Sequence, residues 1–190
     1  MSQSPKLLVR TIILIAAAVF TAGCASSPPA AKFSQRAAAG SVVKAADRAE
    51  IGVTSAAGVA IADYEKARVV ARIKLQLASK QALNEAATPI DYQVDVKITR
   101  YEKGNAFARA MLAGLGQIHL DGEVEVYAMP ARERVMAFTV QKTFAWGGVY
   151  GGTTTMEDVE QSFAEGVANA LTGQGDKQSG RVATTATSSR

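Results

Sequence analysis

The sequence has 190 residues, 21 lysines and arginines against 17 aspartates and glutamates, and a formal net charge of +4. This length suits one domain, and the single cysteine excludes an intramolecular disulfide. No dense basic run with interleaved aromatic residues occurs, so we expect no nucleic-acid partner.

The first 23 residues have the features of a secretory signal peptide. Lys6 and Arg10 precede the apolar stretch Thr11–Phe20, and small residues follow it. This stretch is too short for a membrane span, which requires about 20 apolar residues. We therefore expect residues 1–23 to be removed, which leaves 167 residues with a net charge of about +2.

Cys24 follows directly after this segment. Thr21-Ala22-Gly23-Cys24 resembles the lipobox of bacterial lipoproteins, in which the cysteine thiol carries a diacylglycerol. The resemblance implies that Cys24 is lipidated and anchors the chain to a membrane. The next residue is Ala25 rather than aspartate, which is similar to the pattern of lipoproteins carried onward to the outer membrane. This resemblance implies that the protein is anchored on the periplasmic face of the outer membrane. An ordinary signal peptide followed by a chance cysteine is the alternative.

Two flanking segments lack helix or strand periodicity. Residues 24–40 mix Ser, Pro and Ala, which favours a flexible tether. Residues 173–190 contain many Gly, Ser and Thr and few large apolar residues, so burial cannot offset the entropy of ordering them. We therefore predict a single α+β domain over residues 41–172 and a disordered tail after it.

The sequence patterns that predict the first two elements of the domain differ in strength. Residues 41–53 contain three valines among charged and small residues and predict one short strand. Residues 63–83 predict a helix, with Asp63 as its N-cap, because apolar residues recur at a spacing of four (Val69, Ile73 and Leu77).

Three segments, 90–101, 117–127 and 134–144, alternate as half-buried strands do, and the last two predict an antiparallel hairpin. A short helix is expected from Asn105, a glycine-rich loop over 146–155, and a last helix opened by a capping box of Thr154 and Glu157. This order predicts an α+β fold: a mainly antiparallel sheet of three to four strands with helices packed on one face.

Little in the sequence indicates catalysis. His119, Asp121 and Glu123 alternate on one strand and could converge on a metal, but a solvent-facing strand has the same pattern. No G-x-S-x-G motif or phosphate-binding glycine pattern occurs. We therefore expect no catalytic residue, no metal and no cofactor.

Three residues are candidates for binding. Arg109 lies in an apolar segment and could bind an anion or another chain, or it could snorkel from a small amphipathic helix. Trp146 and Tyr150 flank glycines and could form a contact patch, because aromatic residues are enriched at interfaces. The alternative is that Phe144 and Trp146 complete the core face of the sheet.

The central segment "ITRYEKGNAFARAMLAGLGQIHLDGEVEVY", residues 98–127, resembles a bacterial lipoprotein family known as domain of unknown function 4410. The shared features are a polar turn after a strand, Ala108-Arg109-Ala110, a leucine and glycine run over 112–116, and an alternating strand with a hairpin. The resemblance covers about residues 42–171. It implies an envelope location and an α+β fold, and it carries over no catalytic residue.

From these features we expect a lipid-anchored, non-enzymatic envelope protein that contacts an unidentified protein partner. The alternatives are a periplasmic hydrolase or carbohydrate-binding enzyme with an unrecognised carboxylate site, or a carrier of a small ligand or lipid. A deep pocket lined by carboxylates of raised pKa would favour the enzyme. An exposed apolar patch near Trp146 would favour partner binding, and an enclosed apolar cavity would favour the carrier.

Overall fold

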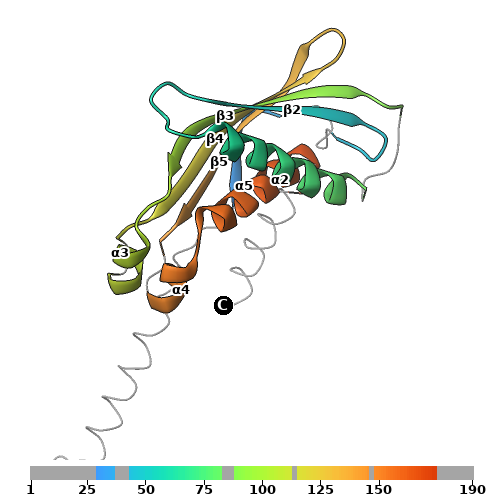
Figure 1. Ribbon diagram of the computed structural model, residues 1–190. Helices are drawn as coiled ribbons and strands as arrows, with labels where there is room; N and C mark the ends of the chain where they lie inside the picture. Colours follow the sequence, from blue (N-terminus) through green and yellow to red (C-terminus); the bar gives the residue numbers. More distant parts are fainter. Residues whose placement is uncertain (1–28, 37–42, 83–87, 113–114, 146–147, 175–190) are drawn as a thin grey trace, which may run out of the picture.

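The computed structural model describes residues 29–36, 43–82, 88–112, 115–145 and 148–174. Within them, five strands form one sheet in the order β1-β5-β4-β3-β2, and two long helices lie on one face of it (Figure 1). The strands are β1 (Ala30–Gln35), β2 (Arg48–Ser55), β3 (Asp91–Glu102), β4 (Ile118–Ala128) and β5 (Glu133–Phe144). The helices are α2 (Asp63–Gln81), α3 (Ala106–Met111), α4 (Gly148–Thr153) and α5 (Met156–Leu171).

The centre of the sheet is antiparallel, as the alternating pattern predicts. β4 pairs antiparallel with both β3 and β5, and Val124 lies opposite Val96 on one side and Phe138 on the other. These three side chains are buried beneath the helices. The α+β class is therefore confirmed, and so are the strands of the predicted hairpin.

The predicted strand number and pairing need two corrections, and β2 supplies the first. It pairs parallel to β3, with Arg48 opposite Asp91 and Ser55 opposite Ile98. The sheet is therefore mixed. The chain between β2 and β3 passes through α2, and a crossover helix of this kind returns the chain to the same end of the sheet and makes the two strands parallel.

β1 supplies the second correction, because residues 30–35 fall in the segment predicted to be a tether. They pair antiparallel with β5, and the rings of Phe33 and Phe138 lie 5.3 Å apart. The side chains of Ser34 and Gln35 donate hydrogen bonds to carbonyl oxygens of β5. Ala, Lys and Ser give weak strand patterning, so pairing with the edge of β5 and the contact of Phe33 with Phe138, rather than local propensity, place this strand.

The described fold therefore begins at Pro29 and not at residue 41. The predicted signal peptide, Cys24 and the rest of the predicted tether up to residue 28 lie outside the described residues, as do residues 175–190 of the predicted tail.

The two long helices form where predicted, but their caps differ by one residue. Ala62 precedes α2, and its N–H donates to the Glu65 carboxylate at 2.9 Å. Thr155 precedes α5, and both its N–H and its hydroxyl donate to Asp158, at 2.8 and 3.0 Å. In each helix an acidic side chain in the first turn satisfies a backbone N–H that has no partner within the helix.

The core lies between the sheet and the pair α2 and α5. Val69, Ile73 and Leu77 of α2 are buried there, as the spacing predicts, together with Phe163 of α5. Gly122 in β4 permits a close approach, because a Cβ atom there would lie 2.9 Å from the Phe163 ring. Among the described residues, no helix has the length and apolar character that crossing a membrane requires.

Candidate functional site

The two short helices lie together at one end of the molecule, beyond the ends of β3, β4 and β5 (Figure 1). α3 begins as predicted, because the Asn105 side chain accepts a hydrogen bond from the Ala108 N–H at 2.9 Å. The prediction of a loop is wrong for residues 148–153, which form α4. Gly152 lies against Ala110, so its missing side chain lets the two helices approach closely. We call this region the α3–α4 end.

Arg109 is buried at the α3–α4 end and does not snorkel to solvent. Its guanidinium donates to the carbonyl oxygens of Gly151 and Thr154, both at 2.9 Å, and of Gly116 at 2.7 Å. A longer bond of 3.4 Å reaches Lys103. Burial lowers the pKa of Arg109, but a guanidinium stays charged in proteins. Arg109 therefore joins the loops around α3 to α4 and to the start of α5.

Gly104 makes this arrangement possible. Its φ of 63° lies in the left-handed region, which glycine adopts without strain. A Cβ atom there would overlap the carbonyl oxygens of Gly116 and Gln117 and lie 2.8 Å from Nη1 of Arg109. The backbone therefore packs closely around the guanidinium.

A buried carboxylate lies next to this end, at the first turns of α5. Glu160 is fully buried and accepts two hydrogen bonds from Arg68, at 2.6 and 2.7 Å, and one from the Tyr101 hydroxyl at 2.7 Å. Arg72 lies 3.4 Å away. Burial raises the pKa of Tyr101, and the hydrogen bond to Glu160 raises it further. The hydrogen bond to the same carboxylate raises the pKa of Arg68. The cluster ties α2 and α5 to β3.

A cavity of about 370 Å³ opens between this cluster and the α3–α4 end. Lys103 and Glu65 in its wall form an ion pair of 2.8 Å, and Arg68 pairs with Glu157 at 3.2 Å. Arg109 also lines the cavity. The charged groups of this wall are thus already paired with groups of the same chain.

We expect acid to weaken the fold partly through Glu65. Burial raises the pKa of its carboxyl, but hydrogen bonds from Lys103 and from the Ala62 N–H outweigh burial and hold the pKa below its ordinary value of 4.5. The contribution of Glu65 to stability is therefore present above pH 4.5 and is lost as the pH falls through the lowered pKa. Urea titrations at a series of pH values give the free energy of unfolding as a function of pH. Glu65→Gln should flatten the acid limb of this curve, which is its fall toward low pH.

The matched control for this measurement is Glu123→Gln, because the Glu123 side chain is half-exposed and lies 3.8 Å from Lys97 on the sheet surface. If the two variants have the same acid limb, Glu65 does not make the contribution described.

The candidate metal ligands His119, Asp121 and Glu123 lie along β4 on the face of the sheet that α2 and α5 do not cover. His119 Nδ1 lies 3.0 Å from the Thr143 hydroxyl. Burial raises the pKa of Asp121, which pairs in register with Arg100. Within the ranges the structure describes, no three His, Cys, Asp or Glu side chains gather as a metal site requires.

Two further cavities lie at the surface. One of about 280 Å³ is lined in part by Lys142, Asp158 and Ser162, and one of about 640 Å³ in part by Lys74 and Asp91. Asp121, the carboxyl whose pKa is raised, lines none of the three cavities.

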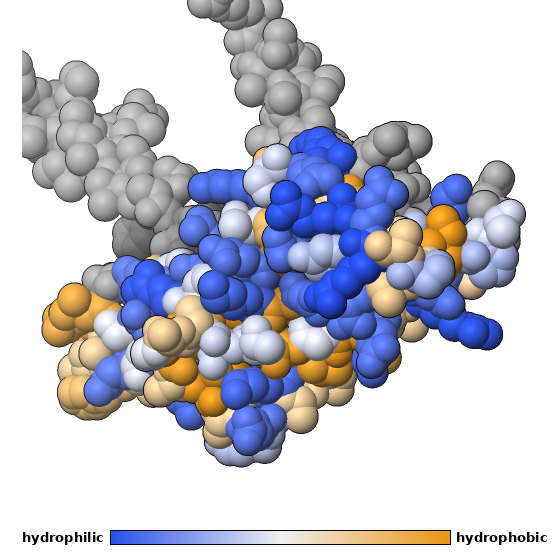
Figure 2. Space-filling model, turned by 90° about the horizontal axis from the view of Figure 1, so that it is seen from above, coloured by the Kyte–Doolittle hydropathy of each residue, from blue (hydrophilic) through white to orange (hydrophobic). Residues whose placement is uncertain are grey.

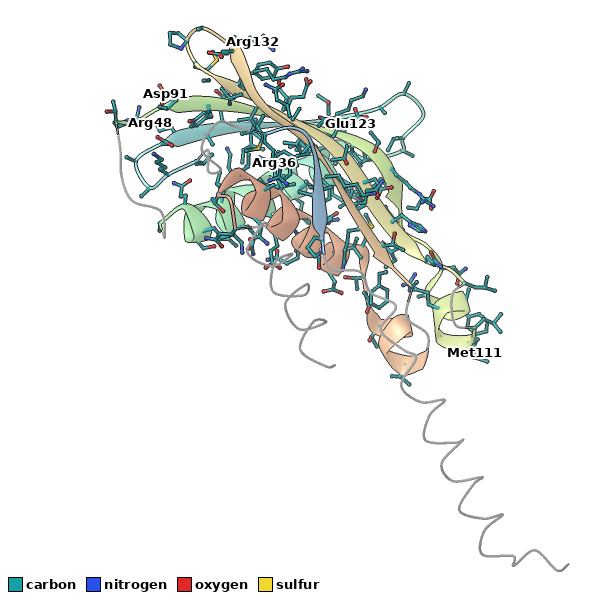
Figure 3. The ribbon with its side chains drawn as sticks, turned by 180° about the vertical axis from the view of Figure 1, so that it is seen from behind. Arg36, Arg48, Asp91, Met111, Glu123 and Arg132 are labelled. Carbon is teal, nitrogen blue, oxygen red and sulfur yellow. The ribbon has the colours of Figure 1, made fainter. Side chains whose placement is uncertain are left out.

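The α3–α4 end also exposes large apolar side chains. Phe107 is 75% exposed and Val149 86% exposed. The other members, each more than half exposed, are Met111, Leu112 and Leu115. Hydrophobic surface is visible at the left end of Figure 2, and Figure 3 shows Met111 at the opposite end of the molecule from Arg132. We call these five residues the apolar tip.

Of the residues predicted to bind, only Arg109 is fully described. Cys24 and Trp146 lie outside the described residues. Tyr150 belongs to α4, but its side chain is not among those described. No local pattern joins the five residues of the apolar tip, because four of them lie within residues 107–115 and Val149 belongs to a separate segment.

This geometry, a five-stranded mixed sheet with two long helices on one face, defines an α+β sheet-and-helix domain. Residues 33–148 match the family described as Domain of unknown function (DUF4410), and the match spans more than half of the chain. The protein belongs to this family, which confirms the resemblance seen in residues 98–127. No curated protein matches the sequence.

The solved structures that match the chain are distant in sequence. Two PelC dodecamers from Paraburkholderia phytofirmans each have a TM-score of 0.51; one is 9% identical and covers 76% of this chain and 97% of its own, and the other is 10% identical and covers 75% and 98%. A candidate lipoprotein from Caulobacter crescentus has a TM-score of 0.35 and 14% identity, over 69% of this chain and 91% of its own. The PelC comparisons support the fold alone.

Proposed function

We propose that the chain is a lipid-anchored envelope protein whose domain acts through contacts with other proteins and not by catalysis. The observation that carries this proposal is the short distance in sequence between Cys24 and the first strand, since β1 begins at Ala30. A lipobox-like cysteine this close to a folded domain would hold the domain against the membrane surface.

The described side chains favour contacts over catalysis. The cavity near the α3–α4 end is walled by charged groups that pair with one another, and none of the three described cavities contains the carboxyl of raised pKa, Asp121. The apolar tip, in contrast, is a surface of the kind that marks binding to a protein or a membrane.

A second copy of this chain is the first protein partner to test. The two PelC structures with this fold were solved as dodecamers. The sheet here ends in two edge strands, β1 and β2, each paired on one side only within the described residues. Such edges offer backbone groups to another chain.

The anchor is tested by Cys24→Ser in the full-length chain. The serine hydroxyl cannot take the thioether-linked lipid, so the variant should move from the membrane fraction to the soluble periplasmic fraction or remain as the uncleaved precursor. Fractionation and metabolic labelling with a radioactive fatty acid measure both. Normal processing and sedimentation of the variant with outer membranes would contradict the proposal.

Purified full-length protein is used to test the hydrolase and carrier alternatives. Enzyme activity would require turnover of a glycan or ester substrate that a carboxylate variant such as Asp121→Asn abolishes. A carrier would co-purify with a lipid or small ligand, which native mass spectrometry detects.

A further inference from the structure

We propose that the apolar tip is a second membrane contact: Phe107, Met111, Leu112, Leu115 and Val149 lie in the surface of the bilayer that holds the lipid on Cys24. This inference rests on the proposed lipid anchor and adds an orientation to it.

The described chain begins at Pro29, next to β1. Pro29 lies against α5, since a Cβ atom on Gly166 would lie 2.7 Å from Pro29 and 3.0 Å from Val140. In the next residue pair, Ala30 lies opposite Gln141 of β5. The start of the fold is therefore fixed beside the second half of β5.

The directions of β1 and β5 show toward which end of the sheet the preceding chain runs. β1 is antiparallel to β5, so the chain before Ala30 continues toward Phe144, the end of β5 that leads to α4. At about 3.4 Å per residue, Gln141 lies about 10 Å from Phe144 and about 27 Å from Glu133 at the hairpin end. The α3–α4 end is therefore the nearer end of the sheet.

Few residues separate Cys24 from the start of the described fold. Cys24 precedes Pro29 by five residues, which span at most about 17 Å when fully extended. This reach covers the end of β5 near α4 but falls short of the hairpin. A lipid on Cys24 therefore places the bilayer beside the α3–α4 end.

The charge of this end fits a lipid surface. Residues 103–118 contain Lys103 and Arg109 and no acidic residue, and residues 143–156 contain no charged residue. The nearby carboxylates Glu65 and Glu157 line the adjacent cavity, and each is paired with a basic side chain of the same chain. Little unpaired negative charge therefore repels anionic headgroups at this end. The apolar side chains can bury their surface among acyl chains, and this burial would add to the anchoring that the lipid on Cys24 provides.

With the apolar tip at the bilayer, the opposite end of the molecule faces away from the membrane. The β4–β5 hairpin lies at the far end from α3 and α4 (Figure 1), with Arg132 exposed in its turn (Figure 3). With the apolar tip in the bilayer, the hairpin points away from the membrane, and the polar face of the sheet stays accessible to proteins.

Two single-residue variants of the full-length chain test the orientation. Met111→Cys places a thiol in the apolar tip, and Met129→Cys is its matched control, because Met129 is also an exposed methionine but lies at the hairpin end. A lipidated Cys24 has no free thiol, so an NBD fluorophore attaches at the new position only. Each labelled protein is reconstituted into vesicles of phosphatidylethanolamine and phosphatidylglycerol, with and without brominated acyl chains.

The probe at position 111 should emit at shorter wavelength in vesicles and lose most of its intensity to brominated lipid. The probe at position 129 should do neither. If both probes keep their intensity although mass spectrometry shows lipid on Cys24, the inference is overturned while the anchor stands. Aqueous iodide is the second quencher. Shielding of position 111 from iodide without quenching by brominated lipid would mean that a second copy of the chain covers the tip, which also overturns the inference.

A chain without lipid on Cys24 would contradict the proposed function separately. In that case the two probes are compared in a Cys24→Ser background mixed with the same vesicles. Quenching at position 111 alone would support the membrane contact without the anchor, and no quenching at either position would overturn it.

Discussion

Arg109→Met should destabilise the protein by about 3 kcal/mol, because it removes a buried guanidinium that donates to three carbonyl oxygens. Arg109 donates to Gly116, Gly151 and Thr154 at 2.7 to 2.9 Å from a site that is only 3% exposed. Methionine fills similar space but donates no hydrogen bond. Urea unfolding followed by circular dichroism measures the loss.

Two controls separate the hydrogen bonds from other effects of this change. Arg109→Lys keeps the charge but cannot reach three carbonyls in different directions. Its free energy of unfolding should therefore lie between those of Arg109→Met and the unmodified protein. Arg132→Met removes an arginine whose side chain is 67% exposed, and it should be close to neutral. If Arg109→Met unfolds at the same urea concentration as Arg132→Met, Arg109 does not stabilise this end.

Glu160→Gln should also cost about 3 kcal/mol, because it removes one partner of a buried ion pair. The carboxylate is fully buried and bonded to Arg68 and Tyr101, and Arg72 lies 3.4 Å away. Glutamine has almost the same shape, so the packing stays the same. Arg68 and Arg72 both lose the charge of Glu160, and Arg68 keeps its pair with Glu157. The free energy of unfolding in urea at neutral pH is the quantity to measure.

The neighbours of Glu160 provide graded comparisons. Tyr101→Phe removes one hydrogen bond and should cost about 1 kcal/mol. Glu123→Gln breaks a half-exposed pair with Lys97 and should cost less than about 1 kcal/mol. Equal effects of Glu160→Gln and Glu123→Gln would show that the buried cluster adds little to stability.

Strong periodicity explains which parts of the fold could be predicted. The alternation in β3 and the spacing of Val69, Ile73 and Leu77 in α2 report directly which side chains face the core. β1 has only six residues at the sheet edge, and the parallel pairing of β2 depends on the crossover through α2. Tertiary contacts decide both, and neither leaves a local pattern.

The candidate site was predicted less well than the fold. Arg109 was singled out because an arginine in an apolar segment requires an explanation, but its partners are backbone carbonyls of distant loops. Glu160 and Arg68 lie 92 residues apart in sequence, and no local motif joins them. Phe107 and Val149 of the apolar tip lie far apart in sequence, and only the fold brings them to one end of the molecule.

Mass spectrometry of the N-terminal tryptic peptide from the membrane-extracted protein is the most direct test of the lipid anchor. A mature chain that begins at Cys24 gives a peptide ending at Lys32, since no lysine or arginine lies between them. We predict that this peptide carries the mass of a diacylglycerol and an acyl group on Cys24. An unmodified Cys24 still joined to Gly23 in the mature protein would contradict lipid anchoring.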